Sequence, residues 1–200
     1  MIIICIIILV LASYIIATQF SYNVGKNYYS DNNFVLPDLG FNIINDMRNY
    51  TSLYKIKETL CLLYIIIFFS LIYSNKKALY EYIITIGLIL LLKNILFSCT
   101  ILPDPSQKCS IFSLSNFTKG SCYDLIISSH SVLLFTSLFV LGFNSIITPI
   151  GLILCLLVTI LIIYFIFALR QHYTIDIINA LVYSFLVFYF TSNAIVPNLL

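Results

Sequence analysis

The chain has two histidines among its 200 residues, and one of them is spaced for acid–base chemistry. His172 is followed four residues later by Asp176, and on a helix this spacing puts both side chains on one face. A carboxylate bonded to one imidazole nitrogen fixes the tautomer and leaves the other nitrogen free as a nucleophile or base. The alternative is an interfacial histidine that happens to satisfy a buried acid, and this short pattern does not separate the two.

Two further ionisable side chains, His130 and Lys93, stand inside apolar stretches. Such residues cost about 2.5–3.5 kcal/mol on insertion scales and usually face a cavity or a partner. His130 lies about two turns into its stretch, and Lys93 lies about nine residues, roughly 14 Å, before the outer end of its own. Structural roles stay open for both: hydrogen bonding between helices for His130, and snorkelling or pairing with an acid for Lys93.

Together these residues suit phosphoryl-group transfer. One histidine would attack phosphorus, the other would carry the proton of the alcohol, and the lysine would balance phosphate charge. A substrate reached from within the bilayer would be a lipid. Asp124, at the expected start of the helix that holds His130, is by itself more typical of a helix cap, because Ser121-x-x-Asp124 fits a capping box.

The elements that position these residues are membrane spans. Hydrophobic residues make up 61% of the chain and charged residues 9%, against roughly 45–50% and 25% in soluble domains. This balance excludes soluble, disordered and coiled-coil proteins, and the net charge of +2 does not indicate nucleic-acid binding. We expect a single all-α membrane domain over 1–200, a six-transmembrane-helix bundle without the period-two pattern of a barrel. The six predicted helices span about 2–20, 59–74, 79–102, 124–142, 147–169 and 174–196.

Helix count predicts which loops share a side of the membrane. The two larger polar loops, 21–56 and 103–123, lie on the same side as the junction near 170–173. The first stretch lacks a basic n-region and its apolar run is longer than a usual signal-peptide core, which favours an uncleaved anchor.

The orientation follows from two weaker signals. Lys76 and Lys77 favour a cytosolic turn at 74–78. N-glycosylation sequons at Asn49 and Asn116 favour a lumenal or extracellular position for the larger loops. We therefore expect a multi-pass protein of the Golgi, the endoplasmic reticulum or the plasma membrane, with its active site on the lumenal or outer side.

The six cysteines do not indicate a metal site. Cys109 and Cys122 bracket the second outer loop, where the compartment would permit a disulfide. Their spacing matches no zinc motif, and no histidine cluster completes one. We expect neither a metal nor another cofactor.

Four blocks of residues, in order over about 36–180, resemble the sphingomyelin synthase family, a membrane branch of the lipid phosphate phosphatase superfamily. Each block is short, and the signal comes from their order and their predicted position on one side. Six helices are also the core of that family. The blocks are Leu36-Pro37-Asp38, similar to P-L-P-D; Lys93 to Thr100 with Leu102-Pro103-Asp104-Pro105, similar to R-x6-T-x-L-P-x-P; Cys122 to Ser131, similar to C-G-D-x3-S-G-H-T; and His172-Tyr173-Thr174-Ile175-Asp176, similar to H-Y-T-[IV]-D.

The resemblance implies roles for the site residues. His172 would be the nucleophile, Asp176 would orient it, and His130 would protonate the departing diacylglycerol oxygen and then deprotonate the accepting hydroxyl. Members of the family transfer a phospho-headgroup from a glycerophospholipid to ceramide. The expected partners are ceramide, phosphatidylcholine or a related phospholipid, and diacylglycerol, with phosphocholine as the expected headgroup. The residues implied to support the site or bind substrate are Lys93, Asp124, Ser128 and Tyr173.

Three positions depart from the pattern of the family. Lys93 replaces arginine and loses bidentate phosphate recognition. Tyr123 and Ser129 replace glycines, and Ser129 adds a Cβ directly before the catalytic-type histidine. These departures bear on the shape of the pocket and the choice of substrate.

Two other functions remain as alternatives. A lipid phosphate phosphatase of the same superfamily would use water in place of ceramide. Its patterns, K-x6-R-P and S-R-x5-H-x3-D, need arginines where this chain has Thr100 and Ile166. A non-enzymatic helix bundle is the second alternative, although the inverted repeats and broken spans of many transporters are not visible.

Overall fold

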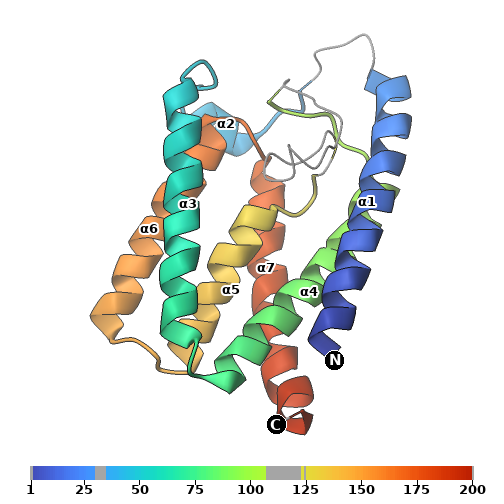
Figure 1. Ribbon diagram of the computed structural model, residues 1–200. Helices are drawn as coiled ribbons and strands as arrows, with labels where there is room; N and C mark the ends of the chain where they lie inside the picture. Colours follow the sequence, from blue (N-terminus) through green and yellow to red (C-terminus); the bar gives the residue numbers. More distant parts are fainter. Residues whose placement is uncertain (1, 30–34, 107–122, 124, 200) are drawn as a thin grey trace.

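The computed structural model describes residues 2–29, 35–106, 123 and 125–199, and every regular element within them is helical. Six helices of 15 residues or more cross the molecule in alternating directions (Figure 1). A short helix, α2, lies across one end of the bundle. The helices are α1 (Ile2–Tyr29), α2 (Leu39–Ile43), α3 (Thr51–Ile72), α4 (Lys76–Cys99), α5 (Ser129–Phe143), α6 (Pro149–Ala168) and α7 (Thr174–Phe190), followed by a π-helical turn (Thr191–Ile195) and a 3₁₀ turn (Val196–Asn198).

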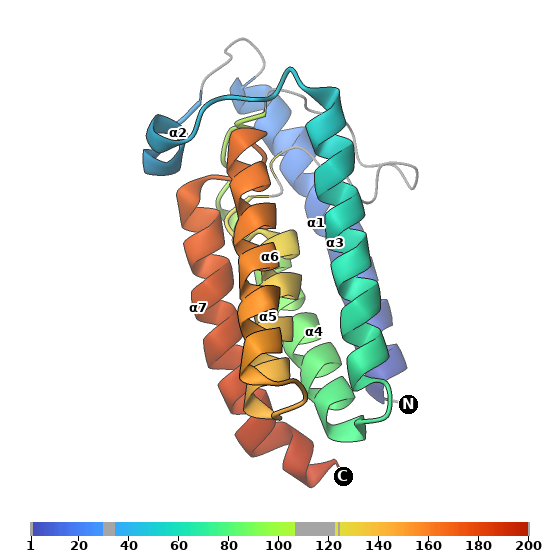
Figure 2. The ribbon, with the colours of Figure 1, turned by 90° about the vertical axis from the view of Figure 1, so that its left-hand side faces the viewer.

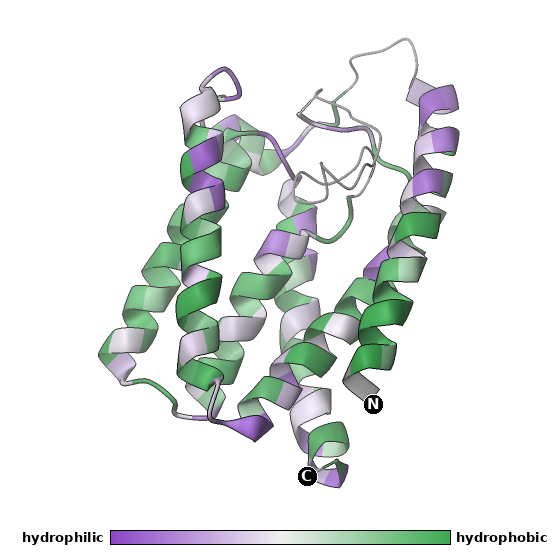
Figure 3. Cartoon of the chain, in the orientation of Figure 1, coloured by the Kyte–Doolittle hydropathy of each residue, from purple (hydrophilic) through white to green (hydrophobic). Residues whose placement is uncertain are grey.

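Four helical segments are long and apolar enough to cross a membrane. They are Ile4–Tyr29, Lys76–Cys99, Pro149–Ala168 and Thr174–Asn198. α5 is apolar but has only 15 residues, and α3 carries Lys55, Lys57 and Glu58 in its first turns. The all-α, multi-pass prediction is therefore supported, while the full count of six spans stays a prediction. Figure 3 shows hydrophobic residues along the helices and hydrophilic ones gathered at the ends.

Several predicted boundaries were wrong, for two physical reasons. Hydropathy locates the part of a helix inside the hydrocarbon, but a helix continues beyond it wherever its backbone can still be bonded. α1 therefore runs to Tyr29 rather than residue 20, and α3 begins at Thr51 rather than 59. α5 begins at Ser129 rather than 124, because the side chain of Ser128 caps the helix there.

α5 is the central helix of the bundle and packs against α4, α6 and α7. Its apolar core side chains, such as Val132 and Leu134, are fully buried. α1 packs on α4, and α3 packs on α6. Figure 2 shows α1 and α3 on the same side of the molecule. The arrangement brings the beginnings of α3, α5 and α7 to one end, together with α2 and the end of α4 (Figure 1).

A buried carboxylate fastens the opposite end of the bundle. Glu81 of α4 accepts hydrogen bonds from Asn144, which follows α5, over 2.6 Å, and from Ser192 of the π turn over 2.8 Å. Lys77 lies 3.6 Å from the same carboxylate. A fully buried charge must be compensated in this way, so Glu81 ties three segments together.

Candidate active site

Asp176 is the buried anchor of the candidate site. Its carboxylate is fully buried at the start of α7, where the helix dipole favours a negative charge. One oxygen, Oδ1, accepts a hydrogen bond from the backbone N–H of Ile126 over 2.8 Å. The other, Oδ2, accepts one from the N–H of Tyr173 over 3.1 Å. These bonds hold the carboxylate against the segment that precedes α5.

His172 is oriented by that carboxylate. Its Nδ1 lies 3.1 Å from Oδ2 of Asp176, and its side chain is 13% exposed. An ionised carboxylate only accepts hydrogen bonds, so the proton is assigned to Nδ1 and the lone pair to Nε2. The prediction that the two residues share a helix face was wrong, because His172 precedes α7, which begins at Thr174. The spacing nevertheless brings them together. Asp176 is the third residue of α7, and from this position its carboxylate extends toward the residues that precede the helix.

His130 lies at the second residue of α5, not two turns inside a helix as predicted. Its Nε2 is 3.7 Å from Oε2 of Glu58 on α3. The backbone N–H of Ser128, two residues earlier, donates to the carbonyl of Asp176 over 3.2 Å and ties the start of α5 to the start of α7. Glu58 in turn pairs over 2.6 Å with Lys57, whose side chain is fully buried. The start of α3 thus contributes an ion pair beside His130.

Glu58 and Lys57 were missed by the analysis of the sequence alone. The second apolar stretch was expected to start at residue 59, which left both residues between the predicted polar loop, 21–56, and the span. The available signal was the charged pair itself, directly at the edge of a span on the predicted outer side. The charged pair marks the end of the span, but its contact with His130 depends on how α3 and α5 pack against each other.

Lys93 is 1% exposed, and its ammonium nitrogen donates a hydrogen bond to the hydroxyl oxygen of Ser129 over 2.5 Å. It lies six residues before the end of α4, about 9 Å along the helix, rather than the predicted nine residues. Because Ser129 directly precedes His130, the cation is held next to the second histidine. The structure therefore brings Lys93 together with the segment that carries His130.

Tyr173 connects three of the four sequence blocks. Its hydroxyl donates to the carbonyl of Pro103 over 2.9 Å and accepts from the N–H of Leu36 over 3.2 Å. Burial raises the pKa of Tyr173 to about 12, so the hydroxyl stays protonated and can donate its hydrogen bond to Pro103. Tyr173 therefore holds the segments around Leu36 and Pro103 against the start of α7.

Asp38 fastens the same end of α7 from the other side. Its carboxylate accepts the N–H of Thr174 over 2.7 Å and the hydroxyl of Thr174 over 2.6 Å. It also accepts the N–H of Phe41 over 3.1 Å and so caps α2. The block that contains Asp38 is thus part of the support around His172.

The segment before α5 has unusual backbone geometry. Tyr123 has φ 66° and Ile126 has φ 85°, a left-handed region that is costly for a β-branched residue such as Ile126. Tyr123 stands where the pattern that this sequence block resembles has glycine, which adopts this region freely. Its ring packs closely on Gly25 of α1, where a side chain would collide with it. Ser128 caps α5, and its hydroxyl accepts a bond from that of Ser131 over 3.0 Å.

Some predicted features fall outside the described residues: Asp124, the sequon at Asn116, and the pairing of Cys109 with Cys122. The four cysteines that the structure describes are all free thiols. Within the described ranges, no group of three or more histidine, cysteine or acidic side chains is placed to hold a metal ion.

The comparisons with known proteins bear on the C-terminal part of the chain. Residues 121–193 match the family model described as PAP2 superfamily C-terminal. This range contains His130, His172 and Asp176. Neither a curated protein nor a solved structure matches the chain. The match supports the PAP2 superfamily, the lipid phosphate phosphatase superfamily to which the resemblance of the sequence blocks also points.

Proposed function

We propose that this protein is a lipid phosphotransferase that moves a phospho-headgroup, phosphocholine in the simplest case, from a glycerophospholipid to ceramide. The observation that carries the proposal is the bond between His172 and Asp176 inside a site that draws residues from all four sequence blocks. The match to the PAP2 superfamily supports phosphoryl-group chemistry on a lipid in general. The ceramide acceptor rests on the resemblance of the blocks.

The first half-reaction begins at Nε2 of His172. Its lone pair attacks the phosphorus of the donor, a P–N bond forms, and the P–O bond to diacylglycerol breaks. Asp176 holds the Nδ1 proton and offsets the positive charge that develops on the ring. His130 donates a proton to the departing oxygen, so diacylglycerol leaves as a neutral alcohol.

The second half-reaction reverses the roles. His130, now neutral, removes the proton from the ceramide hydroxyl, whose oxygen attacks phosphorus and breaks the P–N bond. Glu58 stabilises the protonated form of His130 at each stage, since its carboxylate lies 3.7 Å from Nε2. Lys93, held against Ser129, offsets the negative charge on the phosphoryl oxygens.

The positions of the arginines in the sequence favour transfer to ceramide over hydrolysis by water. The phosphatase pattern requires arginines that bind phosphate, and this chain has only Arg48 and Arg170. Arg170 donates to the carbonyls of Phe41 and Ile44, both over 2.9 Å. Arg48 pairs with Asp46 over 2.7 Å. Neither stands at a position that the phosphatase pattern assigns to an arginine.

The test is a membrane assay of wild type and His172→Ala with fluorescent ceramide and a mixture of phospholipid donors. We expect a phosphosphingolipid that is absent from the variant, and its mobility on chromatography identifies the headgroup. Ile153→Ala, on the exposed face of α6, is the matched control and should retain activity. Phosphate release from phosphatidic acid without any phosphosphingolipid would support the phosphatase instead. Absence of both products from well-expressed protein would refute an enzymatic role on these substrates.

A further inference from the structure

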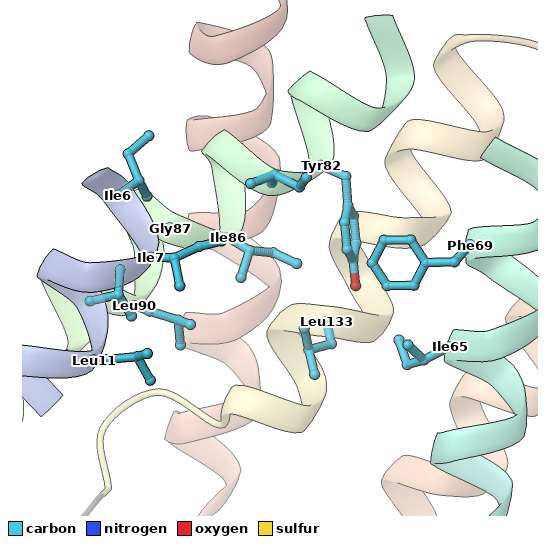
Figure 4. A pocket seen from close by; sticks show the side chains of 12 residues that line it. Ile6, Ile7, Leu11, Ile65, Phe69, Tyr82, Ile86, Gly87, Leu90 and Leu133 are labelled. Carbon is cyan, nitrogen blue, oxygen red and sulfur yellow. The ribbon is translucent and has the colours of Figure 1, made fainter. Parts of the chain in front are cut away.

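A cavity of about 310 Å³ lies between α1, α3, α4 and α5 (Figure 4). Its volume is within the range of pockets that bind small molecules. Nearly all of its lining is aliphatic or aromatic, and the hydroxyl of Tyr82 is the polar group that points into it. Residues that line it include Leu11, Ile65, Phe69, Tyr82, Leu90 and Leu133.

The cavity lies directly beneath the candidate site. Leu133 follows His130 by three residues on α5, and Leu90 precedes Lys93 by three residues on α4. Ile65 follows Glu58 by seven residues on α3. Spacings of three and seven keep residues on one face of a helix. Each of these helices therefore presents a polar group to the site and an apolar group to the cavity one or two turns deeper.

The cavity extends deep into the membrane from the candidate site. Tyr82 lies eleven residues before Lys93 on α4, which is about 16 Å along the helix. Half of the hydrocarbon core of a bilayer is about 15 Å. Tyr82 is also only six residues, about 9 Å, from the start of α4 at Lys76. A chain that starts at the site and follows the cavity would therefore pass the midplane and reach Tyr82 in the inner half of the membrane.

The inner end of the cavity is closed by aromatic rings, and its flank is open. The ring of Tyr82 packs against Phe68 and Phe69 with centroids 4.4 and 5.5 Å apart. Figure 4 shows its hydroxyl pointing away from Ile6 and toward the part lined by Ile65 and Leu133. Exposed side chains line the flank between α1 and α3, including Leu11 at 43% and Phe69 at 40%. This flank would face hydrocarbon in a bilayer.

We propose that the cavity binds one hydrocarbon chain of the lipid whose headgroup occupies the site, and that the rings of Tyr82 and Phe69 set the length of chain it accepts. This inference rests on the proposed function for the identity of the headgroup, but not for the presence of the chain. The lipid reaches the cavity sideways from the bilayer, between α1 and α3. An apolar cavity inside a membrane is filled by hydrocarbon at little cost, since no polar group has to be desolvated.

Activity against donors that differ only in acyl-chain length tests the inference. Tyr82→Ala extends the cavity and should move the preference to longer chains, whereas Tyr82→Phe keeps the ring and should retain the wild-type preference. Leu133→Trp obstructs the outer part and should lower kcat/KM for long-chain donors by at least about tenfold relative to short-chain ones. The control is Ile153→Trp. Ile153 lies on the lipid-facing side of α6, and its side chain is 57% exposed. Unchanged chain-length profiles in Tyr82→Ala and Leu133→Trp would overturn the inference.

A second measurement does not depend on turnover. The chain contains no tryptophan, so Phe69→Trp introduces a single tryptophan, which can be excited selectively, into the lining of the cavity. In detergent, one equivalent of a phospholipid brominated along its acyl chain should quench this fluorescence, and Ile153→Trp should be quenched far less. Equal quenching of the two would refute the site even in an active enzyme. Selective quenching in a protein without transferase activity would instead refute the proposed function and keep the chain site.

Discussion

The ammonium nitrogen of Lys93 and the hydroxyl oxygen of Ser129 are 2.5 Å apart and joined by a hydrogen bond. Lysine and serine stand at these positions, where the sphingomyelin synthase pattern that the sequence blocks resemble has arginine and glycine. The two departures are therefore in contact. A lysine is a point charge on a flexible stem, and the added hydroxyl holds it beside His130.

This contact predicts that the two positions are coupled. Lys93→Arg alone should lower kcat/KM about tenfold, because the larger guanidinium would collide with the side chain of Ser129. Ser129→Gly alone should have a similar effect, because it removes a hydrogen bond to a charged group worth about 1.5–3 kcal/mol. The double variant should recover to within about threefold of wild type. A double-mutant cycle on kcat/KM measures the coupling, and additive losses would contradict it.

Asp176→Asn should abolish most of the activity while the protein still folds. The amide can present its NH₂ group to the imidazole and stabilise the wrong tautomer, which in a serine-protease triad costs about 10⁴ in kcat. We expect a loss of about 10³–10⁴ in kcat here, with little change in KM. Thermal unfolding in detergent provides the check on folding, because a variant that is merely unfolded would lose both stability and binding.

Glu58→Gln should reduce turnover through His130. Removing the carboxylate takes away the charge that stabilises the protonated imidazole, and general acid–base catalysis is typically worth 10²–10⁴. We expect kcat to fall by about 10- to 100-fold with a change in the pH dependence of kcat. Lys55→Gln, at an exposed position on the same helix, is the matched control. If both variants behave alike, the pair of Glu58 with His130 has no functional role.

Tyr173 should make stability sensitive to alkaline pH. Its pKa is raised from 10.0 to about 12 by burial, so its contribution to stability is complete below pH 10 and is lost as pH rises through the folded-state value near 12. Tyr173→Phe should lose about 1–3 kcal/mol at neutral pH with the bonds to Pro103 and Leu36. Its unfolding midpoint should also fall less steeply than that of wild type above pH 10. Parallel pH profiles of the two proteins would contradict this assignment.

Hydropathy along the sequence indicates where the helices lie better than where they end. Runs of apolar residues indicate hydrocarbon-buried helices directly, so each predicted span overlaps one of the six long helices. The ends were less accurate because polar residues, which hydropathy assigns to loops, continued α1 and α3. Ser128, predicted only as a supporting residue, proved to be the cap that begins α5.

The sequence by itself determined that the protein is all-α and multi-pass and which residues are candidates for the site, since composition, the H-x-x-x-D spacing and the order of the four blocks are local properties of the chain. Only the tertiary structure decided which side chains meet. The pair of Glu58 with His130, the contact of Lys93 with Ser129 and the cavity closed by Tyr82 each join different helices. Such contacts depend on how the helices pack and rotate against one another. No spacing along a single helix contains that information.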